Sequence, residues 1–171
     1  MALLNIVKDP DPILRKKATK LRKADDGIRK LAEDMWETML DAPGVGLAAP
    51  QIGKSIRLIT VHVAADEEEG TPEVGYTLLN PEIVKSSGEQ FGAEGCLSIP
   101  GIAGNVKRAQ SVTVKALDLD NKPVRIKAHG YLAVVLQHEI DHLDGVLFTD
   151  LIEDPKENLW MTSEDDEGED E

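Results

Sequence analysis

The segment Tyr131–Leu143 (YLAVVLQHEIDHL) constrains the fold more than any other part of the chain. Its leucine and valine side chains follow helical spacing and lie nearly all round the predicted helix, so we expect this helix to be buried. The same helix carries several polar residues: Gln137, His138, Glu139, Asp141 and His142. Buried polar groups cost free energy unless they are hydrogen-bonded or bind a metal ion. The chain must therefore fold around this helix and satisfy its polar side chains.

The two histidines of this helix form the pattern H-E-x-x-H, from His138 to His142. Side chains four residues apart lie on one helix face, with Cβ atoms about 5–6 Å apart, so both imidazoles can bind one divalent ion. Glu139 is offset by one position and flanks the ion, where a carboxylate can hold and deprotonate a bound water. The structural alternative is a helix with two capped or paired histidines, and burial of all three groups argues against it.

A catalytic metal ion usually takes three protein ligands, so two histidines leave the site incomplete. The carboxylates after the helix, Asp144, Asp150 and Glu153, have no supporting sequence context. Upstream, Cys96 stands in the segment EGCLSIP, and a thiolate is an excellent ligand for zinc or ferrous iron. Gly95 before it lets the backbone come close to the ion. Cys96 is the one cysteine of the chain, so it forms no intramolecular disulfide and is either inert packing or part of the chemistry.

The glycine-rich segment Gly44–Gly53 (GVGLAAPQIG) superficially resembles a dinucleotide-binding loop. That fingerprint follows a strand and opens a helix, whereas this segment follows a predicted helix and is closed by Pro50. Its small residues instead let a substrate backbone or a metal centre approach closely. Gln51 then supplies an amide donor that can stabilise an oxyanion. The alternative is a compact turn in which Gln51 bonds only to backbone.

Amphipathic and β-branched patterns outline the remaining elements. Asp25 and Asp26 precede an apolar stripe at helical spacing that reaches Leu40 and ends at Pro43 and Gly44, so we expect an N-terminal amphipathic helix. The methionines and tryptophan of that stripe are expected in the core. The chain is predicted to have a mostly helical first third, a strand-rich middle and one further helix. Strands are expected over 57–63, 76–84, 111–118 and 124–128.

Two more histidines lie outside these motifs. His62 falls in the first predicted strand and His129 follows the last. Neither has a potential ligand at metal-binding spacing, so we expect both to be structural histidines with satisfied hydrogen bonds.

The charge of the chain is negative and unevenly distributed. The net charge is −13, and the segment Glu164–Glu171 (EDDEGEDE) alone contributes −7, which leaves −6 for the rest. This balance argues against a protein held to nucleic acid by phosphate contacts. We expect one domain over 1–160 and an acidic, flexible tail over 161–171. Without a signal-peptide core or a membrane-length apolar run, a cytoplasmic location is the expectation.

Three segments taken together resemble the motifs of the peptide deformylase family. They are GVGLAAPQ (Gly44–Gln51), EGCLS (Glu94–Ser98) and QHEIDH (Gln137–His142), in the family's order and at similar separations. The resemblance runs from about Lys8 to about Leu151, and the EGCLSIP form is similar to the bacterial type without large insertions. It implies hydrolysis of the formyl group from the N-terminal formyl-methionine of new polypeptides, with release of formate. The implied fold is α+β, with antiparallel β-sheets packed around the central helix that carries H-E-x-x-H.

The resemblance also implies roles at the metal centre. Carried over by position, Cys96, His138 and His142 would bind the metal ion, and Glu139 would be the general acid/base. The native ion of the family is usually Fe²⁺, and Zn²⁺, Ni²⁺ or Co²⁺ are also accepted.

Further residues would bind the substrate. Gln51 and the backbone N–H of Leu97 would hold the formyl oxygen. The peptide would lie extended beside a strand, through main-chain contacts near Val45, Gly46 and Gly95. A methionine pocket would involve Val45, Val134, Val135 and His138.

The C-terminal segment departs from the family pattern. Many bacterial members continue with a long basic helix that is linked in some to ribosome binding. Here Leu151–Trp160 (LIEDPKENLW) allows at most a short helix, and the acidic block follows. Like charge would repel ribosomal RNA, which argues against ribosome docking through this end. The expected partners are N-formylmethionyl peptides, with no direct nucleic-acid binding and no membrane.

Three other readings remain open from the residues alone. Another metallohydrolase or peptidase could use the same Cys-His₂ centre, and activity on formylated against unblocked peptides separates the two. A cysteine hydrolase with Cys96 as nucleophile would survive a chelator. A non-catalytic metal-binding module would leave Gln51 and Glu139 without a purpose.

Overall fold

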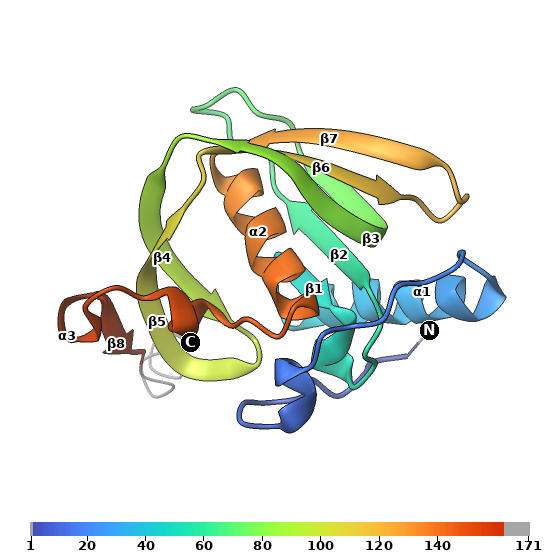
Figure 1. The fold of residues 1–171 in the computed structure, drawn as a ribbon, viewed down its shortest axis with the longest axis horizontal. Coiled ribbons are helices and arrows are strands. Elements are labelled where there is room, and N and C mark those ends of the chain that lie inside the picture. Colours follow the sequence, from blue (N-terminus) through green and yellow to red (C-terminus); the bar gives the residue numbers. More distant parts are fainter. Residues whose placement is uncertain (1, 163–171) are drawn as a thin grey trace.

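A five-stranded antiparallel sheet forms one side of the molecule in the computed structural model, which describes residues 2–162 (Figure 1). The strand order is β1-β2-β3-β6-β7, and every pairing is antiparallel. The strands are β1 (Gly46–Ala48), β2 (Leu58–Val63), β3 (Val74–Ser87), β6 (Ser111–Leu117) and β7 (Pro123–His129).

Helix α2 (Tyr131–Leu143) stands in the middle of the molecule and packs on one face of this sheet (Figure 1). Alternating sheet residues such as Ile59, Val61 and Val114 are buried against it, together with Leu136 and Ile140 from the helix. Every second side chain of these strands packs against the apolar helix. The resulting cluster is the largest source of hydrophobic stabilisation.

Helix α1 (Asp26–Asp41) packs on the opposite face, over β1 and β2. The Asp25 carboxylate caps it by accepting a hydrogen bond from the Ile28 N–H at 2.9 Å. Met35 and Met39 are fully buried against Leu58, which alternates with the Ile59 of the other face. The methionine stripe is therefore core, as its helical spacing predicts.

A second sheet curves round the other side of α2 (Figure 1). Its order is β4-β5-β8, with β4 (Gln90–Cys96), β5 (Ile99–Arg108) and β8 (Leu159–Met161). Ile99 and Val106 of β5 pack with Leu14, Leu147 and Phe148 in a separate small core. Short helices join this region: η1 (Pro12–Arg15), η2 (Ala49–Ile52), η3 (Phe148–Leu151) and α3 (Pro155–Asn158).

The C-terminal end of α2 is fixed to β2. Arg57 is buried and donates to the Leu143 carbonyl and to the Asp144 carboxylate, both at 3.0 Å. A cation at a helix C-terminus opposes the helix dipole and satisfies a free carbonyl. Gly145 ends the turn with φ +75°, and a Cβ there would lie 2.5 Å from the Arg15 carbonyl oxygen. These contacts hold the histidine-bearing helix in place.

Several sequence expectations differ from the structure. The first third is not mostly helical: residues 2–25 contain only η1 and otherwise run extended, bonding to distant backbone such as Leu143 O and Ser55 O. Strands β4, β5 and β8 were not predicted. Glycines interrupt the alternation in β4 and β5, and the short helix α3 leads directly into β8.

The domain boundary expected at residue 160 falls inside β8, while most of the acidic tail lies outside the described residues. Among residues 2–162, no helix has the length and apolarity needed to cross a bilayer.

Candidate metal centre

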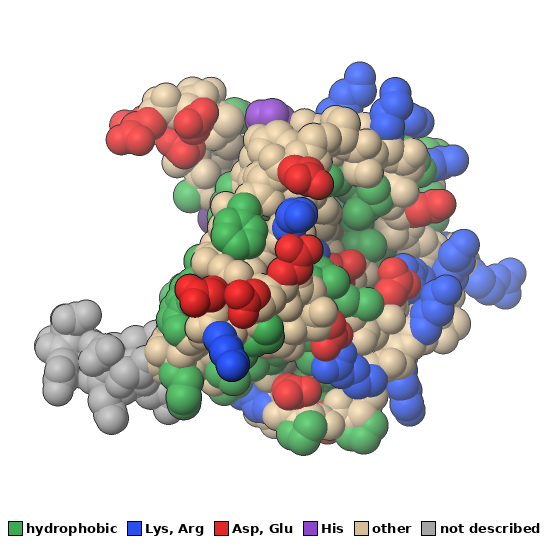
Figure 2. All heavy atoms as spheres, turned by 60° about the vertical axis from the view of Figure 1, so that its left-hand side comes forward, with side chains coloured by type: hydrophobic (Ala, Val, Ile, Leu, Met, Phe, Trp, Pro, Cys, Tyr) green, Lys and Arg blue, Asp and Glu red, His purple; other side chains and the backbone are tan. Residues whose placement is uncertain are grey.

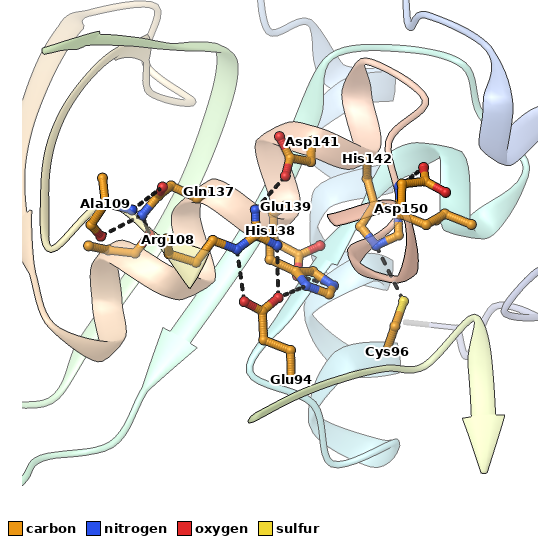
Figure 3. A network of polar contacts seen from close by, with 12 residues as sticks. Glu94, Cys96, Arg108, Ala109, Gln137, His138, Glu139, Asp141, His142 and Asp150 are labelled. Carbon is orange, nitrogen blue, oxygen red and sulfur yellow. Dashed lines mark hydrogen bonds and ion pairs between the residues drawn. The ribbon is translucent and has the colours of Figure 1, made fainter. Parts of the chain in front are cut away.

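Cys96, His138 and His142 meet at one point of the structure. A sulfur from Cys96 and a ring nitrogen from each histidine all lie within 4.8 Å of one another. Cys96 Sγ is 3.3 Å from His142 Nε2 (Figure 3). Cys96 ends β4, and the two imidazoles project from successive turns of α2. A thiolate and two imidazoles are the donor set that Zn²⁺ and Fe²⁺ accept, so these residues fit a divalent ion.

Glu94 fixes the orientation of His138. Its Oε1 lies 2.8 Å from His138 Nδ1, which leaves Nε2 free for a metal ion. Arg108 donates two hydrogen bonds to the Glu94 carboxylate, both at 2.8 Å, and a third to Asp141 at 2.5 Å (Figure 3). This network joins β4, β5 and α2, and both Glu94 and Arg108 are buried.

The surroundings of the two histidines set their charge. Burial lowers the pKa of His142 well below its usual value, and the charges of His138 and Arg108 lower it further. Burial also lowers the pKa of His138, but Cys96 and Glu94 outweigh it and raise that pKa to about 10. Since a ligand binds a metal ion in its deprotonated form, a divalent ion at this site would compete with protons. Burial raises the pKa of Glu94, but the hydrogen bonds from Arg108 and His138 lower it overall.

Glu139 lies beside the histidines and is only 4% exposed. Its Oε2 is 4.0 Å from His138 Nε2, and its Oε1 has no hydrogen-bond partner in the described chain. Burial raises the pKa of Glu139 to about 7, against the opposing effect of the His138 charge. A carboxyl group in this state can accept and return a proton at neutral pH.

Gly46 makes room for that carboxyl group. A Cβ on Gly46 would lie 2.5 Å from Glu139 Oε2 and 2.8 Å from its carboxyl carbon. The glycine-rich segment therefore brings the edge strand β1 close against the helix that carries the two histidines.

Gln51 aims its amide nitrogen at the same point. The Ala48 N–H donates to Gln51 Oε1 at 2.9 Å, which turns Nε2 toward Ser98 Oγ at 3.1 Å and Cys96 Sγ at 3.7 Å. The side chain is 1% exposed. Gln51 thus bonds to backbone with its oxygen and places its amide nitrogen beside Cys96, and its oxyanion role stays a prediction.

A hollow of about 650 Å³ opens from this centre. It lies between two sheet edges, because β1 is the outermost strand of the large sheet and β4 that of the small one. The predicted substrate-binding residues all line it: Val45, Gly46, Gly95, Leu97, Val134 and Val135. A glycine is not sterically required at position 95, since a Cβ there would have its nearest neighbour at 3.9 Å.

Other residues considered from sequence lie elsewhere. His62 pairs with Glu73 at 2.9 Å, and His129 contacts Ser111 at 2.8 Å, so both are satisfied away from the hollow. Asp150 pairs with Arg15. Sequence reasoning did not single out Arg108 or Ser98. Arg108 lies in a strand that was not predicted, and its buried charge has no periodic pattern in the sequence. Glu94 stands in the EGCLS motif, but the motif gave no role to Glu94 itself.

Comparisons with known proteins agree with this geometry. The family model described as Polypeptide deformylase matches residues 3–158. A protein named Peptide deformylase from Thermomicrobium roseum is 54% identical over 168 residues, which are 98% of this chain and 96% of the relative.

Two solved structures are also similar. The crystal structure of a peptide deformylase from Legionella pneumophila has a TM-score of 0.83 and 47% identity, covering 91% of this chain and 89% of that one. The peptide deformylase from Ehrlichia chaffeensis in complex with actinonin has a TM-score of 0.85 and 41% identity, covering 91% and 92%. The antiparallel α+β fold predicted from sequence is confirmed at this level.

Proposed function

The chain belongs to the peptide deformylase family, and from this premise we propose how its own residues perform the family reaction. It is a metal-dependent hydrolase that removes the formyl group from N-terminal formyl-methionine of newly made polypeptides. The observation that carries the residue assignment is the convergence of one sulfur and two ring nitrogens within 4.8 Å, from chain segments 42 or more residues apart.

We propose Cys96, His138 and His142 as the metal ligands. The hydrogen bond from His138 Nδ1 to Glu94 presents the other ring nitrogen to the ion. Three protein ligands leave one position open, the arrangement typical of a catalytic site. We propose Fe²⁺ as the native ion, with Zn²⁺, Ni²⁺ or Co²⁺ as alternatives, because thiolate and imidazole donors suit all four. When bound, the ion lowers the pKa of water toward ~7 and polarises the formyl carbonyl.

Gln51 and the N–H of Leu97 would stabilise the negative charge that develops on the formyl oxygen. Gln51 Nε2 is fixed by the Ala48 contact to its amide oxygen, so it needs no reorganisation. Preorganised donors of this kind, aimed at the developing charge, are typically worth ~2.7–4 kcal/mol of barrier each.

Glu139 would move the proton. Its carboxylate is buried beside the proposed ligands and has an unpartnered oxygen, so it can take a proton from the attacking water and then give it to the leaving amine. The C–N bond of the formamide breaks, the peptide keeps a free amine, and formate departs. One buried carboxyl group thus serves as base and then as acid.

The peptide would lie extended in the hollow between β1 and β4. Both are edge strands, so their free backbone groups can pair with an added chain. Val45, Gly46 and Gly95 offer such contacts beside the centre. The methionine side chain would pack against Val134 and Val135, next to His138.

We further propose one catalytic domain that includes all of β8 and so reaches Met161, one residue beyond the boundary expected from sequence. The enzyme would work in the cytoplasm, where formylated N-termini are produced.

The experiment that tests these assignments is anaerobic purification, metal analysis and an assay of formate release from a formyl-methionyl peptide. We expect one divalent ion per chain, release of formate and no cleavage of the same peptide with a free amine. Cys96→Ala should abolish both metal content and turnover. Cleavage of an internal bond in the unblocked peptide would identify a peptidase instead.

A chelator separates the metal mechanism from a thiol mechanism. Turnover should stop on metal removal and return when the ion is restored. Activity that persists without the ion and disappears on alkylation of Cys96 would assign the chemistry to the sulfur alone.

A further inference from the structure

One face of the large sheet is covered over only part of its width. Helix α1 packs over β1, β2 and the first half of β3, where Trp36 donates to Thr77, whereas the same face of the second half of β3 and of β6 and β7 carries exposed basic side chains. Figure 2 shows Lys and Arg side chains gathered along one side of the molecule. The basic residues of this outer face are Lys85, Lys115, Arg125 and Lys127, and we call these four the basic face.

The strand register places the four cations in two neighbouring rows. Lys115 of β6 lies directly opposite Arg125 of β7. In the next row Lys85 and Lys127 flank Thr113 from either side. Like charges directly opposite each other destabilise a sheet, so this arrangement works against stability in the absence of an anion. Two residues along a strand separate the rows by about 6.7 Å.

Within the described residues, the four cations of the basic face outnumber its acidic side chains and form no ion pair. None of the four cations forms an ion pair there, although Arg15, Arg29, Lys30, Arg57, Lys107 and Arg108 all do. Glu82 lies on this face in strand register with Lys115, but the two side chains form no ion pair, so four cations stand against one carboxylate. The basic face is therefore locally positive on a chain whose net charge is −13, so the expectation of no nucleic-acid binding, which rested on the net charge, does not hold for this face.

Hydroxyl groups lie beside these cations. A hollow of about 270 Å³ opens between Lys85 and Lys127 and is lined by Ser111, Thr113 and His129 among others. Hydroxyls and ammonium groups together are the donors that most often contact phosphate oxygens. The hollow thus adds directional donors to the positive field.

We propose that the basic face binds the phosphodiester backbone of RNA. Repeated cations in rows match a polyanion with repeated phosphates better than a single small anion. Val84 is the one large hydrophobic residue exposed on these three strands, and the His129 ring is engaged by Ser111 and Gln110, so the face offers no Trp, Tyr or Phe platform for bases and lacks the apolar anchors that bilayer insertion needs. The binding is therefore independent of base sequence and strongly dependent on salt.

The position of the basic face suits the activity. Lys115 alternates along β6 with Val114 and Ala116, which pack toward α2, so the basic face and the metal centre lie on opposite sides of the sheet. RNA bound there leaves the hollow open to a peptide. The choice of RNA among polyanions rests on the function, because formylated polypeptides are made on RNA machinery.

Charge reversal with a matched control tests the proposal. The variant Lys85→Glu with Lys127→Glu changes the net charge by −4, and so does the control Lys54→Glu with Lys156→Glu, whose lysines are exposed outside the basic face. Affinity of the metal-loaded enzyme for a short, unstructured, labelled RNA is measured by fluorescence anisotropy between about 50 and 200 mM salt. We expect the first variant to bind at least about tenfold more weakly and to lose about 1.4 from its salt slope, whereas the control keeps the slope.

Further measurements distinguish RNA binding by the basic face from a loss of enzyme activity, a general charge effect and membrane binding. Formate release from a short peptide should be equal in both variants, so a loss there would concern the enzyme function and not the basic face. Equal weakening of RNA binding in the two variants would show a general charge effect and overturn the proposal. Binding to vesicles of anionic phospholipid but not to RNA would assign the face to a membrane surface and overturn it as well.

Discussion

At Gly46 the backbone comes close to the carboxyl group of Glu139, the proposed acid/base. Any side chain there would overlap Glu139, whose carboxyl oxygen would be 2.5 Å from the new Cβ. We predict that Gly46→Ala displaces Glu139 and lowers kcat about 100-fold, since a misplacement of about 1 Å in a catalytic group can cost that much. Steady-state formate release and metal analysis measure it, and the metal content should be unchanged.

Gly92 of β4 provides the control for Gly46. A Cβ at Gly92 would have no heavy atom within 4 Å, so Gly92→Ala should leave kcat unchanged. If Gly46→Ala is as active as Gly92→Ala, the close packing between β1 and Glu139 does not position the carboxylate.

Substitution of Gln51 tests whether its amide stabilises the negative charge on the formyl oxygen. We predict that Gln51→Ala lowers kcat about 10²–10³-fold while KM and metal content change little, because the lost donor acts only on the developing charge. The measurement is a full Michaelis–Menten analysis on a formyl-methionyl peptide with metal determination. An unaffected kcat would reject the role.

Substitution of Glu139 tests whether its carboxyl group moves the proton from the attacking water to the leaving amine. Glu139→Ala should retain the metal ion but lose about 10²–10⁴-fold in kcat, because general acid–base catalysis typically contributes that much. Metal analysis is the decisive second measurement here. A variant that loses its ion would make Glu139 a ligand rather than the acid/base.

At the scale of elements, the Arg108 guanidinium joins β4, β5 and α2 through Glu94 and Asp141. Arg108→Met leaves Glu94 buried without its partner, which typically costs about 3–5 kcal/mol in the free energy of unfolding. Urea denaturation measures this cost. Competition with a chelator measures metal affinity, which we expect to fall because His138 loses its fixed orientation.

Lys107 is the matched control on the same strand. Its pair with Glu153 is long, at 3.7 Å, and exposed, so Lys107→Met should change the free energy of unfolding by less than about 1 kcal/mol. Equal destabilisation by both variants would mean that the Arg108 network adds no more than a surface pair.

The elements with a strong period were predictable from sequence. The stripe from Ile28 to Leu40 lies in α1, and the apolar run of Tyr131–Leu143 is α2. The four predicted β-branched segments correspond to β2, β3, β6 and β7. The small sheet was not predictable, because the glycines of β4 and β5 break the alternation that identifies strands. Its identity as a sheet depends on partners far away in the chain.

The site was predictable to the extent that its residues stood in motifs. Cys96, Gln51 and the two histidines were singled out, and the structure brings them together. Arg108 was missed because a single arginine carries no spacing signal. Its importance comes from burial beside Glu94, which is a property of the folded molecule.

At the scale of the whole molecule, the metal ion would join the two sheets. Cys96 belongs to the small sheet, whereas α2 packs on the large one. A ligand at 100 times its dissociation constant stabilises by about 2.7 kcal/mol, which for a chain of this size raises Tm by roughly 5–10 °C. We predict that chelation lowers Tm by about that amount, as differential scanning calorimetry would show.

The variant Cys96→Ala supplies the comparison for this shift. Its Tm should respond weakly to chelator or added ion, since the sulfur from the small sheet is gone. A full response in that variant would show that the ion acts through α2 alone.

The division of the ligands between local and distant chain has a consequence for the order of folding. The two imidazoles lie side by side once one turn of α2 has formed. The Cys96 sulfur reaches them only after β4 and β5 have packed against that helix. A nascent or half-folded molecule therefore offers the cation two ligands and holds it loosely. Tight binding of the ion would therefore require the packing of β4 against α2, so the kinetics of ion uptake would report when that packing forms.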